Sequence, residues 1–165
     1  MRILGIDPGT INFGYGVVDG EDKMTMVDCG VLTFSSRIPI EQRLHSLHTK
    51  LNEIITRYQP DEVAIEEPFV AKNVRSALAV GRSQAVAMLA GAGQGLPVYC
   101  YTPTYIKQQV TGYGNSSKEQ VKEVVKIQLD LSRLPQSSDA ADALAVAICH
   151  LRQIHLKRVL SASKE

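Results

Sequence analysis

Four carboxylates stand at positions where their type and spacing could support chemistry. Asp7 ends the first apolar run of the chain, and Glu66 ends a later one. Asp139 and Asp142 are three residues apart near the start of an expected helix, and this spacing puts both side chains on one helix face. If the two runs are neighbouring strands and the helix start packs at the same end of the sheet, the four acids meet.

A cluster of four carboxylates within a few ångströms requires cations, because the negative charges repel one another strongly. Mg²⁺ is the natural choice, since it is a hard cation that takes oxygen ligands and often shares its coordination shell with substrate phosphates. Two such ions about 4 Å apart can activate a water and stabilise the leaving oxygen of a phosphodiester. The cluster therefore predicts metal-dependent hydrolysis without a covalent intermediate.

Each carboxylate also has a simpler structural interpretation. Asp7 begins an Asp-Pro-Gly turn, in which the carboxylate bonds a nearby backbone N–H. Glu66 could be a residue that reaches water at the end of its strand. Asp139 could be a helix N-cap, and Asp142 a first-turn acid favoured by the helix dipole. The combination of all four favours the chemical interpretation.

The charges are segregated along the chain. Lys and Arg number 18 and Asp and Glu 17, so the net charge is +1, yet residues 68–118 contain no acid. A basic surface beside an acidic metal site suits a phosphodiester substrate, because the basic side chains hold the backbone. The alternative is a few solvated charges on an Ala-rich helix. The basic residues of this segment, all candidate DNA contacts, are Lys72, Arg75, Arg82, Lys107 and Lys118.

Phe69 lies in an expected loop shortly after Glu66, in a chain with only 5% aromatic residues. It either docks on the core, or stacks on or wedges between nucleobases beside the cleavage site. Tyr113, inside a Gly-Tyr-Gly sequence, is a second candidate of the same kind.

Alternating apolar and turn-forming segments predict the elements that position these residues. Three short strands with short connections indicate an antiparallel meander, and helices alternate with two further strands. The pattern predicts an α/β protein with a mixed five-stranded sheet flanked by helices, compatible with an RNase H-like fold. We expect strands at Arg2–Ile6, Tyr15–Val18, Met24–Phe34, Glu62–Ile65 and Val98–Tyr101, and helices at Ile40–Tyr58, Val74–Gly93, Pro103–Val110, Ser117–Leu131 and from the Ser-Ser-Asp segment to about His155.

The length of 165 residues predicts one domain, over 1–155, followed by a short polar tail over 156–165. Three widely spaced cysteines without a Cys-x-x-Cys pair favour free thiols in a reducing compartment. No apolar run approaches the length of a membrane span, and we expect a cytoplasmic protein. Serine-hydrolase elbows, phosphate-binding Walker loops and His-Glu-x-x-His zinc motifs are absent from the sequence.

Five motifs in order resemble the RuvC family of Holliday-junction resolvases. They are LGIDPGT with a following YGV (4–10 and 15–17), AIE (64–66), F-x-x-K-N (69–73), the segment 107–118 with its G-x-G, and DAADALA (139–145). Any one of these motifs is weakly specific, whereas all five at the family's spacing are highly specific. The resemblance extends from the N-terminus to about residue 155.

The resemblance implies an RNase H-like fold, a homodimer, and paired symmetric nicking of four-way DNA junctions to give 5′-phosphate and 3′-hydroxyl ends. It implies a carboxylate tetrad of Asp7, Glu66, Asp139 and Asp142 that binds two Mg²⁺ per subunit, with Mn²⁺ as a substitute, where Asp142 either ligates metal or positions water. Phe69, Lys72 and Asn73 match the family's junction-contacting motif. Lys107 and Lys118 match basic residues near the scissile phosphate. Family members also work with the RuvA–RuvB branch-migration complex.

Two other hypotheses remain open at this point, and the length argues against a third. Another RNase H-like nuclease, acting on RNA–DNA hybrids or pre-rRNA ends, would carry the same carboxylates. A catalytically inactive junction-binding module would keep the basic segment, although the intact tetrad disfavours it. An actin-like ATPase domain also opens with a strand and an Asp-containing turn, but 165 residues leave no room for its two lobes.

Overall fold

A computed structural model describes residues 1–20, 23–67 and 74–162. The strands in this part of the chain are β1 (Arg2–Asp7), β2 (Asn12–Gly20), β3 (Met24–Thr33), β4 (Glu62–Glu66) and β5 (Val98–Tyr101). They form one five-stranded sheet in the order β3-β2-β1-β4-β5. The first three strands are an antiparallel meander, and β4 and β5 run parallel to β1. The expected mixed sheet is confirmed.

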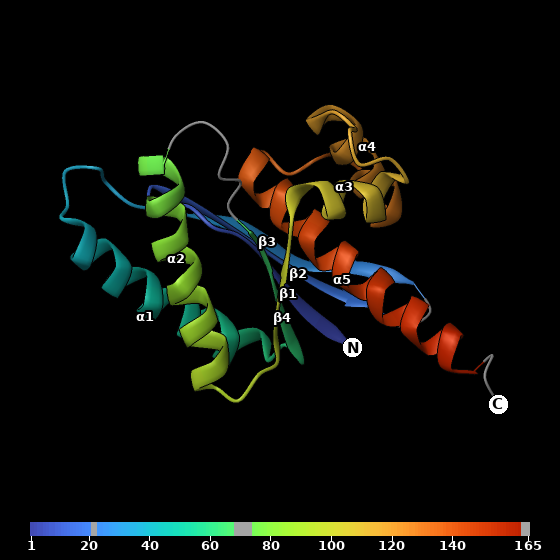
Figure 1. Ribbon diagram of the computed structural model, residues 1–165, viewed down its shortest axis with the longest axis horizontal. Helices are drawn as coiled ribbons and strands as arrows, with labels where there is room; N and C mark the ends of the chain where they lie inside the picture. Colours follow the sequence, from blue (N-terminus) through green and yellow to red (C-terminus); the bar gives the residue numbers. More distant parts are fainter. Residues whose placement is uncertain (21–22, 68–73, 163–165) are drawn as a thin grey trace.

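Helices cover both faces of the sheet (Figure 1). One layer contains α1 (Ile40–Tyr58) and α2 (Val74–Gly93), which pack against each other. The other layer contains α3 (Pro103–Thr111), α4 (Lys118–Gln128) and α5 (Ser138–Ala162). Figure 1 shows α5 crossing the sheet, with α3 and α4 beside its N-terminal half.

Alternation along β1 assigns its side chains to the two faces. Leu4 and Ile6 are buried in the core under α1 and α2, whereas Ile3 packs in the core under α5. Gly5 shares the α5 face, and a Cβ there would stand 2.2 Å from the backbone oxygen of Ala143. The lack of a side chain at Gly5 therefore lets α5 lie directly on the strand backbone.

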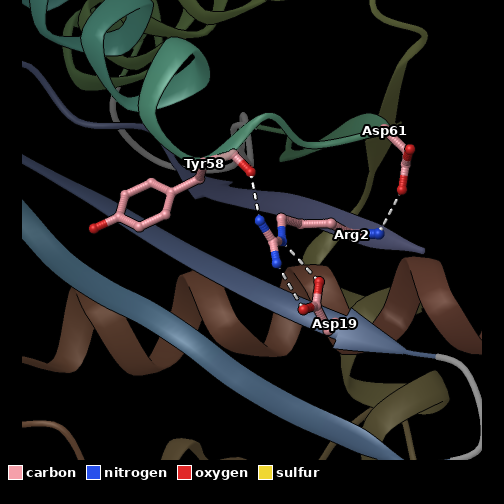
Figure 2. Close-up of polar contacts among 4 residues, drawn as sticks. All are labelled: Arg2, Asp19, Tyr58 and Asp61. Carbon is pink, nitrogen blue, oxygen red and sulfur yellow. Dashed lines mark hydrogen bonds and ion pairs between the residues drawn. The ribbon is translucent and has the colours of Figure 1, made fainter.

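A polar cluster around Arg2 links β1 to β2, to the end of α1 and to the segment before β4, at the opposite end of β1 from Asp7 (Figure 2). The guanidinium donates two hydrogen bonds of 2.8 Å to the carboxylate of Asp19 on β2, and a third to the backbone oxygen of Tyr58 at the end of α1. The backbone N–H of Arg2 donates to Asp61, just before β4. A bidentate Arg–carboxylate pair is geometrically specific. The cluster therefore supports the pairing of β1 with both β2 and β4.

Two helix ends differ by more than one residue from the sequence-based expectation. α4 ends at Gln128 rather than Leu131, because Asp130 adopts a left-handed conformation with φ of +52°. α5 continues to Ala162, past the expected end at His155, because no Gly or Pro interrupts residues 156–162. The first seven residues of the expected polar tail are thus helical.

The three cysteines are free thiols, as expected. None of the helices within residues 1–20, 23–67 and 74–162 is long and apolar enough to cross a bilayer.

Candidate active site

Asp7 and Glu66 are neighbours because of the parallel register of β1 and β4. Ile6 pairs with Ile65 across the two strands, so the next residue of each strand points to the same opposite face. That face is the one covered by α3, α4 and α5, where Ile3 and Ala64 are buried. Both carboxylates therefore point from the ends of adjacent strands toward the helical layer.

The start of α5 brings two further carboxylates to the same end of the sheet. The hydroxyl of Ser137 accepts a hydrogen bond of 3.2 Å from the backbone N–H of Asp139, so Ser137, and not Asp139, caps the helix. A Cβ on Gly14, the partner of Asp7 on β2, would stand 2.1 Å from the backbone oxygen of Asp139. The bare backbone at Gly14 is what allows Asp139 to approach Asp7.

A cavity of about 160 Å³ lies at the meeting point of these elements. Three of the four predicted carboxylates line it, and Asp139 stands beside it, close enough to repel Asp7. The remaining walls are aliphatic or cationic side chains from α3, α4 and α5. The lining residues are Asp7, Glu66, Pro103, Ile106, Lys107, Lys118, Val121, Asp142 and Ala145.

The carboxylates repel one another in this partly buried setting. Burial, followed by the negative charges of Glu66, Asp142 and Asp139, raises the pKa of Asp7 to about 8. Burial, followed by the charge of Asp142, raises the pKa of Glu66 to about 7. Two acids that hold protons near neutral pH indicate a surplus of negative charge, which is the electrostatic signature of a functional site.

Two lysines partly offset this surplus. The ammonium of Lys118 donates a 3.0 Å hydrogen bond to Asp142, whose side chain is only 14% exposed. This bond, together with the charges of Asp142, Asp7 and Glu66, raises the pKa of Lys118. Lys107 lowers the pKa of Glu66 through its charge. Four carboxylates thus face two ammonium groups, and a formal charge of −2 remains when all are ionised.

The donor set fits a hard divalent cation. All four acidic groups offer oxygen, and a dication would neutralise the charge that the two lysines leave. The described residues contain no group of three or more acidic, His or Cys side chains already arranged to hold an ion. Asp142 bonds the ammonium of Lys118 through one of its two carboxylate oxygens.

The predicted DNA-contacting residues within the described part of the chain lie at different distances from the cavity. Lys107 and Lys118, which the family resemblance predicts near the scissile phosphate, line the cavity. Arg75 and Arg82 are exposed on α2, which packs with α1 on the opposite face of the sheet, so the fold does not bring them to the cavity. The predicted contacts Phe69, Lys72 and Asn73 lie outside the described residues.

Sequence reasoning missed two features of the site. The pairing of Lys118 with Asp142 depends on how α4 packs on α5, and no local pattern encodes it. Sequence reasoning also assigned no place at the site to Ile106, Val121 and Ala145, which form the aliphatic walls of the cavity. They give the cavity an apolar lining beside the carboxylates.

No histidine lines the carboxylate cavity. His150 is buried and bonds Glu62 through Nε2 at 2.5 Å and the Tyr101 hydroxyl through Nδ1 at 2.6 Å. Glu62 begins β4, whereas Glu66 ends it, so this polar group lies toward the other end of the strand.

Comparison with known proteins assigns the family. The family model described as crossover junction endodeoxyribonuclease RuvC matches residues 3–150. The chain belongs to the RuvC family. A crossover junction endodeoxyribonuclease RuvC of Dehalococcoides mccartyi is 52% identical over 162 residues, which cover 98% of this chain and 97% of the relative. One from Chloroflexus aggregans is 50% identical over 91% of this chain and 92% of its own length.

Solved structures agree with the architecture of this RuvC-family chain. A Thermus thermophilus RuvC structure superposes with a TM-score of 0.88 and 34% identity, covering 95% of this chain and 97% of the other. A structure titled T. thermophilus RuvC in complex with Holliday junction substrate gives a TM-score of 0.90 at 33% identity, covering 95% and 96%. The yeast mitochondrial resolvase Ydc2, at 16% identity and a TM-score of 0.70 over 94% of this chain and 80% of its own, shares the fold. The RNase H-like fold expected from the sequence is thereby confirmed.

Proposed function

We propose that this protein resolves four-way DNA junctions by paired symmetric nicks, through Mg²⁺-dependent hydrolysis that leaves 5′-phosphate and 3′-hydroxyl ends. The observation that carries the proposal is the convergence of Asp7, Glu66 and Asp142 in one cavity walled by two lysines. The chain belongs to a family of crossover junction endodeoxyribonucleases. The similarity to T. thermophilus RuvC, whose structure is titled as a complex with Holliday junction substrate, supports the choice of substrate.

Asp7, Glu66 and Asp139 are the proposed central ligands of two Mg²⁺ ions, and Mn²⁺ would serve in their place. When bound, the metal supplies an activated water and charge neutralisation at the phosphodiester. Asp142 either completes the ligand set or orients the attacking water. The aliphatic walls limit access of bulk water, which strengthens electrostatic interactions inside the cavity.

Lys118 has two roles in this proposal. Without metal it neutralises Asp142 through their 3.0 Å contact. Because 65% of its side chain is exposed, its ammonium is free to turn outward when Asp142 takes up its role toward metal or water. Lys118 and Lys107 then hold the scissile phosphate, whose negative charge grows in the transition state.

Paired nicks require two sites, and α2 offers a surface on which two copies can pair. An apolar stripe at helical spacing runs along its exposed side, with Val74 at 68%, Leu78 at 60% and Leu89 at 65% exposure. A Cβ at Gly81, on the same stripe, would meet nothing within 4 Å. We propose that this stripe is the seam of a C2 homodimer, which matches the two-fold symmetry of the junction.

Sedimentation velocity at micromolar concentration tests the seam. The wild-type protein should sediment as a dimer, and Leu89→Glu, which places a charge in the stripe, should sediment as a monomer. Arg82→Gln is a matched exposed control on the same helix and should remain dimeric. A dimeric Leu89→Glu protein would show that the subunits pair elsewhere.

The substrate proposal is tested by comparing three nucleic acids of equal length: a mobile four-way junction, a linear duplex and an RNA–DNA hybrid. We expect symmetric paired nicks in the junction with Mg²⁺ and none with Ca²⁺. Equal cleavage of all three substrates would favour a general RNase H-like nuclease. Junction binding without cleavage in Mg²⁺ would favour an inactive junction-binding module. Addition of the RuvA–RuvB complex should accelerate resolution, as the family resemblance implies.

A further inference from the structure

The loop between α3 and α4 is a hydrogen-bonded bridge between the two lysines of the site. The hydroxyl of Thr111 donates to the backbone oxygen of Lys107 at 2.9 Å and lies 2.7 Å from the hydroxyl of Ser116. Ser116 is buried, and its hydroxyl also bonds the backbone oxygen of Tyr113 at 2.8 Å. The backbone N–H of Tyr113 donates to the Thr111 hydroxyl at 3.1 Å. Two hydroxyl groups therefore fix the backbone of Tyr113 relative to Lys107.

The far end of the loop is fixed as firmly as its start. Ser117 and Gln120 form a reciprocal capping box at the start of α4, which sets the position of Lys118. Gly112 closes α3 in the left-handed region, with φ of +84°. A Cβ at Gly114 would stand 3.0 Å from the side chain of Thr104, so the loop also packs closely on α3.

This loop presents an aromatic ring to solvent. Tyr113 is 60% exposed, and its hydroxyl accepts only a long contact of 3.5 Å from the Asn115 amide. Tyr99, at 36% exposure, is the other exposed aromatic side chain of the described residues, and its ring contacts His150. The aromatic face of Tyr113 is therefore accessible to a ligand that approaches the loop from solvent.

We propose that the ring of Tyr113 stacks on a nucleobase of the cleaved strand beside the scissile phosphate. The proposal rests on the function assigned above to the carboxylate cavity. Tyr113 lies in sequence between Lys107 and Lys118, the two cationic side chains that line that cavity, and the hydroxyl of Thr111 links its backbone to that of Lys107. A phosphate held by these lysines has its flanking bases within a few ångströms, and an aromatic face stacks on any base. Stacking would fix the strand so that one phosphodiester faces the carboxylates.

Single-turnover nicking of a four-way junction tests the proposal with three variants. Tyr113→Ala should lower the nicking rate at subsaturating enzyme by about 5- to 100-fold, the usual range for the loss of one stacked base. Tyr113→Phe should retain wild-type nicking, because the ring face remains. Ile127→Ala removes a 74% exposed apolar side chain elsewhere in this layer, on α4, and should also nick like wild type.

A 2-aminopurine placed on either side of the cleavage site reports stacking directly in Ca²⁺ buffer. Its fluorescence should be quenched by the wild-type and Tyr113→Phe proteins and restored with Tyr113→Ala. If wild type nicks the junction and Tyr113→Ala nicks equally well, Tyr113 has no such role. If Tyr113→Phe loses as much as Tyr113→Ala, the contact is made by the hydroxyl, and stacking is wrong. A wild-type protein that does not nick would instead refute the proposed function.

Discussion

Replacing Asp7 with Asn should stabilise the metal-free protein while it abolishes Mg²⁺-dependent nicking. The carboxyl of Asp7 has an ordinary pKa of 3.8 and a pKa of about 8 in the folded protein, because it is buried beside other acids. Between these two values the unfolded chain loses a proton that the folded chain retains. Stability is therefore highest at low pH and falls as the pH rises toward 8. Asn removes this penalty because it does not ionise.

The size of the effect follows from the pKa difference. About four pKa units correspond to roughly 6 kcal/mol if nothing relaxes. Relaxation and water penetration lower such penalties to a few kcal/mol in real proteins. We expect a gain of about 2–3 kcal/mol at pH 8, which is roughly 4–12 °C in Tm for a chain of this size. At pH 5 most of the gain disappears, because this pH is only about one unit above the ordinary pKa of the carboxyl and the free-energy cost of keeping Asp7 protonated is small.

Calorimetric unfolding of wild type and Asp7→Asn in EDTA measures the stability gain at pH 5 and at pH 8. Glu53→Gln, which neutralises an exposed carboxylate on α1, is the matched control and should change Tm little at either pH. The reasoning is refuted if Asp7→Asn lowers Tm at pH 8, or if its gain is the same at both pH values. Either result would mean that Asp7 is not held in a repulsive cluster.

Two further substitutions test how the site is assembled. Lys118→Gln removes the ammonium paired with Asp142, and the single-turnover nicking rate should fall by about 100-fold, as for the loss of one charge-stabilising donor; an unchanged rate would remove Lys118 from the mechanism. Gly14→Ala places a Cβ 2.1 Å from the backbone oxygen of Asp139, and thermal unfolding should show a loss of about 1–3 kcal/mol together with slower nicking. Gly93→Ala, where a Cβ meets nothing within 4 Å, is the control and should keep both wild-type stability and activity.

The sequence predicted the parts of the site that depend on strand ends and on helix periodicity. Asp7 and Glu66 end apolar runs, so a parallel neighbouring pair places them together whatever the surrounding detail. The bounds of α2 and β5 also follow from local patterns and match the expected ones. The predicted ends of α4 and α5 were wrong. The left-handed conformation of Asp130 ends α4 early, and continued helical propensity past His155 extends α5.

Contacts between elements could not be predicted in the same way. The approach of α5 to the sheet depends on the absence of side chains at Gly5 and Gly14. The need for glycine at these positions follows from the packing of the helix and is not visible in the sequence. The Lys118–Asp142 pair joins the starts of two helices, and its two residues are 24 positions apart in the sequence. Its formation depends on tertiary packing of α4 against α5, which no local spacing encodes.

Calorimetric titration of Mg²⁺ into the metal-free protein at pH 7, in two buffers with different ionisation enthalpies, tests the central claim most directly. Because Asp7 and Glu66 hold protons near neutral pH, metal binding should release protons, and the observed heat should differ between the buffers. Asp7→Asn and Glu66→Gln should each weaken binding by at least about tenfold. Equal Mg²⁺ affinity in wild type and both variants, with no proton release, would contradict a cation site built from these carboxylates.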